Sequence, residues 1–236
     1  MLRPYQPAAS EAASPKQPPL PLRLLRRILI GGRHTIGEHV LIAGNHCGEM
    51  AEWLDELGFD VEAIDDSSER LAATKKCGGR FEIHFSNLDE STDVSEELFD
   101  LIIADELVLH RENLLCLKSR LATAHLLSRL KPGGELVVVR EPGHGMPHDA
   151  TCWTRHLACF PGRLEAVEYP IPWFSRETWK WLTGQGHPER FLTVSLRAPS
   201  EPLAELEWSL HARRGLLTSN ASCCSQAQDA QSRRVA

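Results

Sequence analysis

The chain has 236 residues, of which 42% are hydrophobic and 25% are charged, and its formal net charge is −6. These are the proportions of a globular protein with one domain and a sizeable core. The negative charge gives no general attraction to nucleic acid or to an anionic membrane surface, and the seven cysteines, which form no Cys-x-x-Cys pair, indicate neither a zinc ribbon nor a closed disulfide framework.

The cysteine content is typical of a reducing compartment. No apolar run approaches the roughly 20 residues that span a bilayer, and the first residues lack the pattern of a secretory signal. The sequence therefore predicts a cytoplasmic protein that does not cross a membrane.

The composition changes near both ends of the chain. Residues 1–22 are rich in proline and poor in large apolar side chains, which predicts a disordered arm. Apolar residues at near-helical spacing within residues 22–30 favour a helix over the edge of the domain. Residues 201–236 are expected to be a mostly disordered tail, because small and polar residues predominate at the end of the chain. A single domain is thus predicted over residues 23–200.

Strand and helix patterns alternate within this domain. Strands are predicted over residues 39–44, 59–66, 80–88, the first half of 98–110, and 135–142. Helices are predicted over residues 49–57, 67–76 and 112–130, with a turn at residues 131–134. Strands separated by helices of this length need right-handed crossovers, so the fold class is α/β, with a doubly wound and mostly parallel sheet.

Ligands of such sheets bind where loops leave the carboxyl ends of the strands. Gly44 ends the first strand and Gly48 opens the next helix, so the backbone can approach a ligand closely there. Asp65 ends the second strand, where its carboxylate can accept hydrogen bonds from both hydroxyls of a ribose. The same residues also fit a tight strand-to-helix connection and a carboxylate at a helix N-terminus, so both alternatives stay open.

Three segments, taken in order, carry a family resemblance over roughly residues 38–140: "HVLIAGNHCGEMAEWLDELGFDVEAIDDSSERL", "LFDLIIADELVLH" and "LLSRLKPGGELVVV". They resemble the motifs of class I S-adenosylmethionine-dependent methyltransferases. The resemblance implies a Rossmann-like methyltransferase fold, S-adenosylmethionine as cofactor and a small-molecule methyl acceptor. Two further predicted strands, at residues 163–171 and 190–199, would supply the antiparallel hairpin that completes the family's seven-stranded sheet.

The resemblance also implies roles for individual residues. Gly44 and Gly48 would flank the methionine part of the cofactor, Asp65 would hold its ribose, and Asn87 with Leu88 would lie beside its adenine. The complete expected cofactor-binding set is Gly44, Asn45, His46, Gly48, Asp65, Asp66, Asn87, Leu88 and Ala104.

The loop after the fourth strand faces the methyl acceptor in the family. Methyl transfer needs the acceptor atom to be held in line with the sulfonium methyl group and, for some acceptors, a group that removes a proton. Here that loop offers Asp105, Glu106 and His110 as the candidate catalytic residues, with acceptor-orienting or proton-accepting roles.

Two residues depart from the family pattern. Ile42 stands near the end of the first strand, where relatives carry an acidic residue that helps to anchor the cofactor's ammonium group. His46 replaces the central glycine of the loop, and its side chain must point away from the cofactor, reshape the loop or crowd the methionine end. An altered but functional loop and a loop that has lost its ligand are both open readings.

Three functions follow from these observations. The first is methyl transfer to an N, O or C atom of a small molecule. The second is a non-catalytic methyltransferase-like protein that binds a protein partner, for which Ile42 and His46 are the motivation. The third is an NAD(P)-dependent oxidoreductase, although "GNHCGE" fits the dinucleotide-binding glycine pattern poorly.

Two other segments invite a functional reading. Three histidines and a cysteine lie in "HGMPHDATCWTRH", where His148, Cys152 and His156 step by four residues downstream of His144. This spacing matches no recognised metal site, and no metal is predicted. Residues 173–182 are rich in aromatic side chains, which fit either a helix packed on the sheet edge or a lid over a small acceptor.

Overall fold

The computed structural model describes residues 28–44, 47–69, 71–72, 83–85, 98–105, 107, 114–140, 150–170 and 190–215. Seven strands form one sheet in the order β3-β2-β1-β4-β5-β7-β6. The strands are β1 (His39–Gly44), β2 (Asp60–Asp65), β3 (Ile83–Phe85), β4 (Phe99–Asp105), β5 (Leu130–Arg140), β6 (Arg163–Pro170) and β7 (Arg190–Arg197). The helices with defined bounds are α2 (Cys47–Glu56), α5 (Leu117–Ser128) and α6 (Ala150–Leu157).

The pairing of the strands confirms the predicted architecture. β1 pairs in parallel with β2 and β4, and the parallel arrangement continues to β3 on one side and to β5 on the other. β7 runs antiparallel to both β5 and β6, which makes the predicted antiparallel hairpin. The sheet is therefore doubly wound and mostly parallel, with one reversed strand between β5 and β6.

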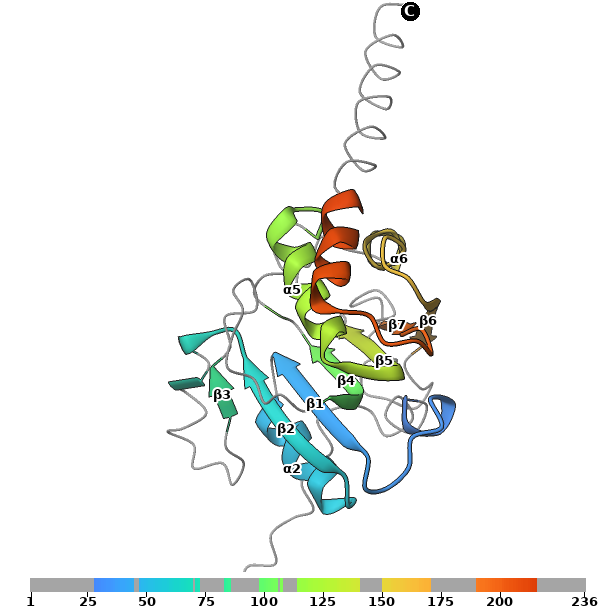
Figure 1. Ribbon diagram of the computed structural model, residues 1–236. Helices are drawn as coiled ribbons and strands as arrows, with labels where there is room; N and C mark the ends of the chain where they lie inside the picture. Colours follow the sequence, from blue (N-terminus) through green and yellow to red (C-terminus); the bar gives the residue numbers. More distant parts are fainter. Residues whose placement is uncertain are drawn as a thin grey trace, which may run out of the picture.

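Helices cover both faces of the sheet (Figure 1). α2 lies on one face, and α5, α6 and a helix at residues 205–215 lie on the other. All six residues of β1 are buried. Val40 and Ile42 join a core cluster with Met50 and Leu54 of α2, whereas Leu41 joins the cluster on the α5 face. Burial on both faces explains why β1 reads as an unbroken apolar run.

The predicted turn at residues 131–134 is wrong, because this segment lies inside β5. Leu130 pairs with Phe99 and Glu135 pairs with Leu101, so the intervening residues bulge out of register opposite Asp100. The bulge has backbone partners beyond β7: the Gly133 amide donates to Pro199 O at 2.8 Å, and Gly134 O accepts from the Ala198 amide at 2.8 Å. These bonds let β5 continue through a proline and two glycines.

The helix predicted over residues 112–130 is shorter than expected. α5 begins at Leu117, because Cys116 acts as its N-cap and its Sγ accepts the Ser119 amide at 3.4 Å. A cysteine is a weak acceptor, which explains why sequence pattern alone did not indicate a cap at this position.

The packed domain extends beyond the predicted boundary at residue 200. Residues 205–215 form a helix, and the carboxylate of Glu207 accepts the Ala204 amide at 2.9 Å at its start. Trp208 and Ala212, one turn apart, are 3% and 0% exposed and belong to the core cluster on the α5 face. The ring of Trp208 lies 6.3 Å from that of Phe160. In the part of the chain that the structure describes, no helix has the length and apolarity to span a membrane.

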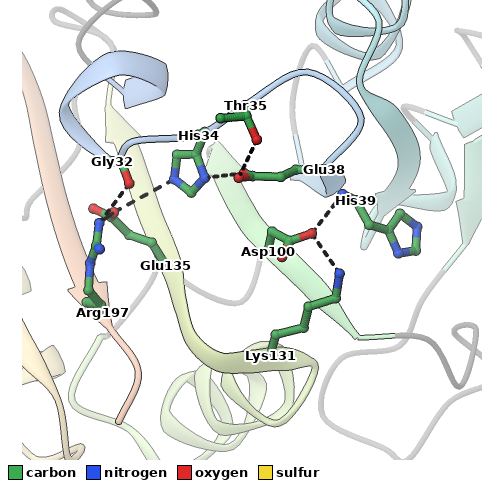
Figure 2. A network of polar contacts seen from close by, with 9 residues as sticks. All are labelled: Gly32, His34, Thr35, Glu38, His39, Asp100, Lys131, Glu135 and Arg197. Carbon is green, nitrogen blue, oxygen red and sulfur yellow. Dashed lines mark hydrogen bonds and ion pairs between the residues drawn. The ribbon is translucent and has the colours of Figure 1, made fainter. Parts of the chain in front are cut away.

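Polar side chains tie residues 28–38 to the sheet (Figure 2). Arg197 Nη2 donates to Glu135 Oε2 at 2.7 Å and to the backbone carbonyl of Gly32 at 3.1 Å. His34 lies between two carboxylates: its Nδ1 is 2.7 Å from Glu38 Oε2, and its Nε2 is 3.8 Å from Glu135 Oε2. The segment before β1 is thus held to β5 and β7 by charge.

This cluster shifts two pKa values in opposite directions. Burial by itself lowers the pKa of His34, but the carboxylates of Glu135 and Glu38 outweigh burial and raise that pKa above its ordinary 6.5. Burial opposes ionisation of Glu135, yet its contacts with His34, Arg197 and Ser195 lower its pKa from 4.5 to about 2. A raised histidine pKa stabilises the fold at low pH, and a lowered acid pKa stabilises it at higher pH. The cluster therefore stabilises the fold most between pH 4.5 and 6.5, the ordinary pKa values of the glutamate and the histidine.

We expect the His34→Gln variant to lose a pH-dependent part of the stability. The difference in unfolding free energy between the native chain and the variant should be largest below pH 6.5 and should shrink as the pH rises through the higher folded-state pKa of His34. Urea unfolding from about pH 5 to about pH 9 measures this difference. His211→Gln, on the outer helix at residues 205–215, is the control. A difference for His34→Gln that does not vary with pH would contradict a charged His34.

We expect Trp208→Ala to destabilise the protein by about 3–5 kcal/mol, because it removes a buried aromatic side chain from the core. Leu206, in the same helix, is 70% exposed. Leu206→Ala should therefore change stability by no more than about 0.5 kcal/mol. Denaturant unfolding of both variants measures the two effects, and equal effects would mean that the helix at residues 205–215 does not pack on the domain.

Candidate functional site

Three neighbouring strands end together at the carboxyl edge of the sheet. Gly44 of β1 pairs in register with Asp105 of β4. Asp65 of β2 follows directly after the pair formed by Ala43 and Ile64. Gly44, Asp65 and Asp105 therefore lie in one row across β2, β1 and β4. This is the edge at which ligands of doubly wound sheets bind.

Gly44 is required by the backbone geometry of this row. Its φ is +108°, a conformation that side chains rarely adopt, and a Cβ added there would lie 1.8 Å from the carbonyl oxygen of Asp105. The β1 backbone thus approaches the end of β4 too closely for any other residue. The glycine also lets the chain leave β1 toward α2, where Gly48 lies half-buried in the first turn.

Asp65 is 3% exposed and receives a hydrogen bond from the loop that follows it. Its Oδ1 accepts the amide of Ser67 at 2.8 Å, which shapes the turn into the helical residues at 68–69. Asp65 therefore has the structural role that was left open as an alternative, that of a carboxylate at the N-terminus of a helix. A carboxylate has about four acceptor sites, so it can accept several hydrogen bonds at once.

Asp105 and Ala104 end β4 in buried positions. Asp105 is 1% exposed, and Ala104 is 2% exposed within the core cluster on the α5 face. The side chain of Ala104 is therefore part of the core, and its role toward a cofactor stays a prediction. Asp66, the next residue of the expected cofactor set, is half-buried after β2.

Comparisons with known proteins bear on the fold. No protein-family model and no curated protein matches the chain. Among solved structures, the N-methyltransferase NodS from Bradyrhizobium japonicum is 22% identical, with a TM-score of 0.50 over 75% of this chain and 93% of that chain. A SAM-dependent methyltransferase from Methanosarcina mazei is 14% identical, with a TM-score of 0.51 over 73% of this chain and 98% of that chain.

The YcgJ protein from Bacillus subtilis is 10% identical, with a TM-score of 0.52 over 76% of this chain and 99% of that chain. The chain has the class I methyltransferase fold. Within this fold, Gly44 and Asp65 of the expected cofactor set lie in one row with Asp105, which the sequence analysis named as a candidate catalytic residue.

One departure from the family pattern is visible in the methyltransferase fold. Ile42 is 0% exposed and packs with Met50, Leu54 and Leu101 in the core cluster on the α2 face. Its side chain is thus a core residue and offers no charge to a cofactor. The second departure, His46, lies outside the described residues.

Several predicted site residues also lie outside the described residues, so their roles stay predictions. They are Asn45, His46, Asn87, Leu88, Glu106 and His110. The aromatic segment at residues 173–182 and the histidines His144 and His148 lie outside as well.

His156 has a structural role in the methyltransferase fold. It is 0% exposed, its Nε2 lies 2.8 Å from Thr123 Oγ1, and its Nδ1 contacts the backbone carbonyl of Leu114. The two ring nitrogens thus join α6 to α5 and to the segment that precedes α5. Among the residues that the structure describes, no group of three or more His, Cys, Asp or Glu side chains could hold a metal ion.

A cavity at the opposite end of the strands was not predicted from the sequence. It has a volume of about 450 Å³, and three arginines, Arg33, Arg163 and Arg197, contribute to its lining. The three come from separate segments of the chain, and no local motif connects them.

We expect Gly44→Ala to destabilise the protein by roughly 3 kcal/mol or more, because the new Cβ adds a backbone clash to an unfavourable φ. Gly133 is the matched control, because its φ is +76° but an added Cβ would meet nothing within 4 Å. Gly133→Ala should cost only about 1–2 kcal/mol. Denaturant unfolding measures both changes. Equal losses would show that the close approach to Asp105 does not constrain Gly44.

Proposed function

We propose that the chain is an S-adenosylmethionine-dependent methyltransferase that transfers a methyl group to an N, O or C atom of a small-molecule acceptor in the cytoplasm. The observation that carries the proposal is the row of Gly44, Asp65 and Asp105 at the carboxyl edge of a sheet with the methyltransferase strand order. NodS, which shares the fold with a TM-score of 0.50, has been solved in complex with S-adenosylhomocysteine, and this supports the choice of cofactor.

The residues at this edge fit the proposed cofactor. The buried carboxylate of Asp65 would accept hydrogen bonds from the ribose hydroxyls, as its position at the end of β2 permits. Gly44 would let the chain pass close to the methionine part and enter α2. Asp105 adds a second carboxylate to the same row, which favours a cationic ligand. When bound, S-adenosylmethionine supplies a methyl group on a positively charged sulfur.

In methyl transfer, the residues of the chain would position the acceptor atom and, for some acceptors, remove its proton. The acceptor atom must lie about 3–3.5 Å from the methyl group and in line with the bond that breaks. Asp105 at the end of β4, with Glu106 and His110 after it, remain our candidates for orienting the acceptor or accepting its proton.

A second candidate function is a non-catalytic protein with the same fold that binds a protein partner. The burial of Ile42 in the core favours it, because an alkyl side chain cannot anchor the ammonium group of the cofactor. The bond from the Ser67 amide to Asp65 also explains that carboxylate without a ligand.

The topology disfavours the third candidate, an NAD(P)-dependent oxidoreductase. Dinucleotide-binding Rossmann sheets have the strand order 3-2-1-4-5-6 and are parallel. Here β7 is inserted antiparallel between β5 and β6.

We expect Asp65→Asn to weaken binding of S-adenosylhomocysteine at least tenfold, because the amide loses one acceptor oxygen and the negative charge. Asparagine keeps an oxygen that can accept the Ser67 amide, so the turn should survive. Isothermal titration measures the dissociation constant, and Asp60→Asn, at the exposed start of the same strand, is the control. Unchanged binding by Asp65→Asn would contradict the proposed site.

The His46→Gly variant separates an enzyme from a non-catalytic protein. A native chain that binds S-adenosylmethionine would support the enzyme. We expect such binding and little change in His46→Gly. If the native chain binds neither S-adenosylmethionine nor S-adenosylhomocysteine and the variant binds both, the histidine closes the site and the non-catalytic function is correct.

A further inference from the structure

The cavity of about 450 Å³ lies on the sheet face that α2 also covers, over β5, β7 and β6. Its charged residues share one row of the sheet, because Glu135 pairs with Arg197 and Arg197 pairs with Arg163. Thr193 and Ser195 add hydroxyl groups along β7. The volume lies within the range of small-molecule sites, which is about 300–1,000 Å³.

The charges that line this cavity leave a cationic surplus. Arg197 is paired with Glu135 at 2.7 Å, and Glu135 also faces His34 at 3.8 Å. Within the part of the chain that the structure describes, the side chains of Arg33 and Arg163 make no hydrogen bond or ion pair. Three arginines and two glutamates, Glu135 and Glu165, line the cavity, so its described lining carries a net positive charge.

Arg33 occupies a backbone position that normally favours glycine. Its φ is +61°, and it is the one non-glycine residue with positive φ among those described. The Arg33 amide donates to Ile30 O, and the His34 amide donates to Leu29 O, which is the Schellman pattern at the end of the helical residues 28–31. Glycine is the commonest residue at this position of the Schellman pattern, because it has no Cβ. Strained positions are typical of sites where a particular side chain is needed.

We propose that this cavity is a binding site for a small organic anion, whose carboxylate or phosphate group is held by Arg33 and Arg163. Planar guanidinium groups suit both anions, because two parallel N–H groups match two oxygens. The site is separate from the proposed cofactor site. Glu135 pairs with Leu101, whereas Val139 pairs with Asp105, so the charged row lies four residues, or roughly 13 Å, along the strands from the carboxyl edge.

The test uses two probes, inorganic phosphate and citrate, titrated into the full chain by calorimetry at constant ionic strength with chloride as the reference anion. We expect saturable binding of at least one probe. Binding of phosphate alone indicates a phosphate ester as the natural ligand, and binding of citrate alone indicates a carboxylate. Binding of neither probe overturns the proposal.

Three variants locate the binding. Arg163→Gln and Arg33→Gly should each weaken the affinity for the bound probe at least tenfold. Arg33→Gly should also raise the denaturant midpoint of unfolding, because glycine adopts a positive φ without strain. Arg155→Gln is the control, since Arg155 is an exposed arginine of α6, which packs on the opposite face of β6 and β7. Binding of S-adenosylhomocysteine should not change in any of them. Equal affinities for the probe in Arg163→Gln and Arg155→Gln would overturn the proposal.

Discussion

Burial of β1 on both faces is the constraint on which the rest of the structure depends. Every residue of β1 is buried, and its side chains alternate between the cluster under α2 and the cluster under α5. A strand covered in this way can satisfy its backbone polar groups only by pairing along both edges. β1 pairs with β2 on one side and β4 on the other. The register of these two pairings decides which residues reach the carboxyl edge together, and so where a ligand can bind.

Gly44 and Ile42 of β1 support different functions: Gly44 fits a cofactor site, whereas Ile42 offers no charge to a cofactor. At Gly44 the backbone of β1 comes so close to the end of β4 that an added Cβ would lie 1.8 Å from the carbonyl oxygen of Asp105. Ile42, two residues earlier, faces the core beneath α2. An acidic side chain there would need a cationic partner to offset its desolvation, whereas an alkyl side chain stabilises the core directly. The first strand thus combines an end that requires glycine with an apolar side chain in the core.

The two ends of the strands differ in charge. Asp65 and Asp105 stand at the carboxyl edge, where we propose that the positively charged S-adenosylmethionine binds. At the other end, Arg197 is neutralised by Glu135, and Arg33 and Arg163 form the anion site that we propose. Strands buried on both faces accept few charges within their length, so charged groups collect at their ends. A single sheet can in this way carry two sites of opposite preference.

The sequence by itself determined the strands, their alternation with helices and the residues at the strand ends, because these depend on local periodicity. The positions of Gly44 and Asp65 followed, since parallel strands bring their carboxyl ends to one edge. Only the tertiary structure decided that residues 131–134 stay within β5, that Trp208 enters the core, and that arginines from three segments line one cavity. Each of these depends on groups that lie far apart in the chain: backbone partners beyond β7, the aromatic ring of another loop, or strands paired in register. No local pattern carries that information, because the interactions exist only once the sheet has formed.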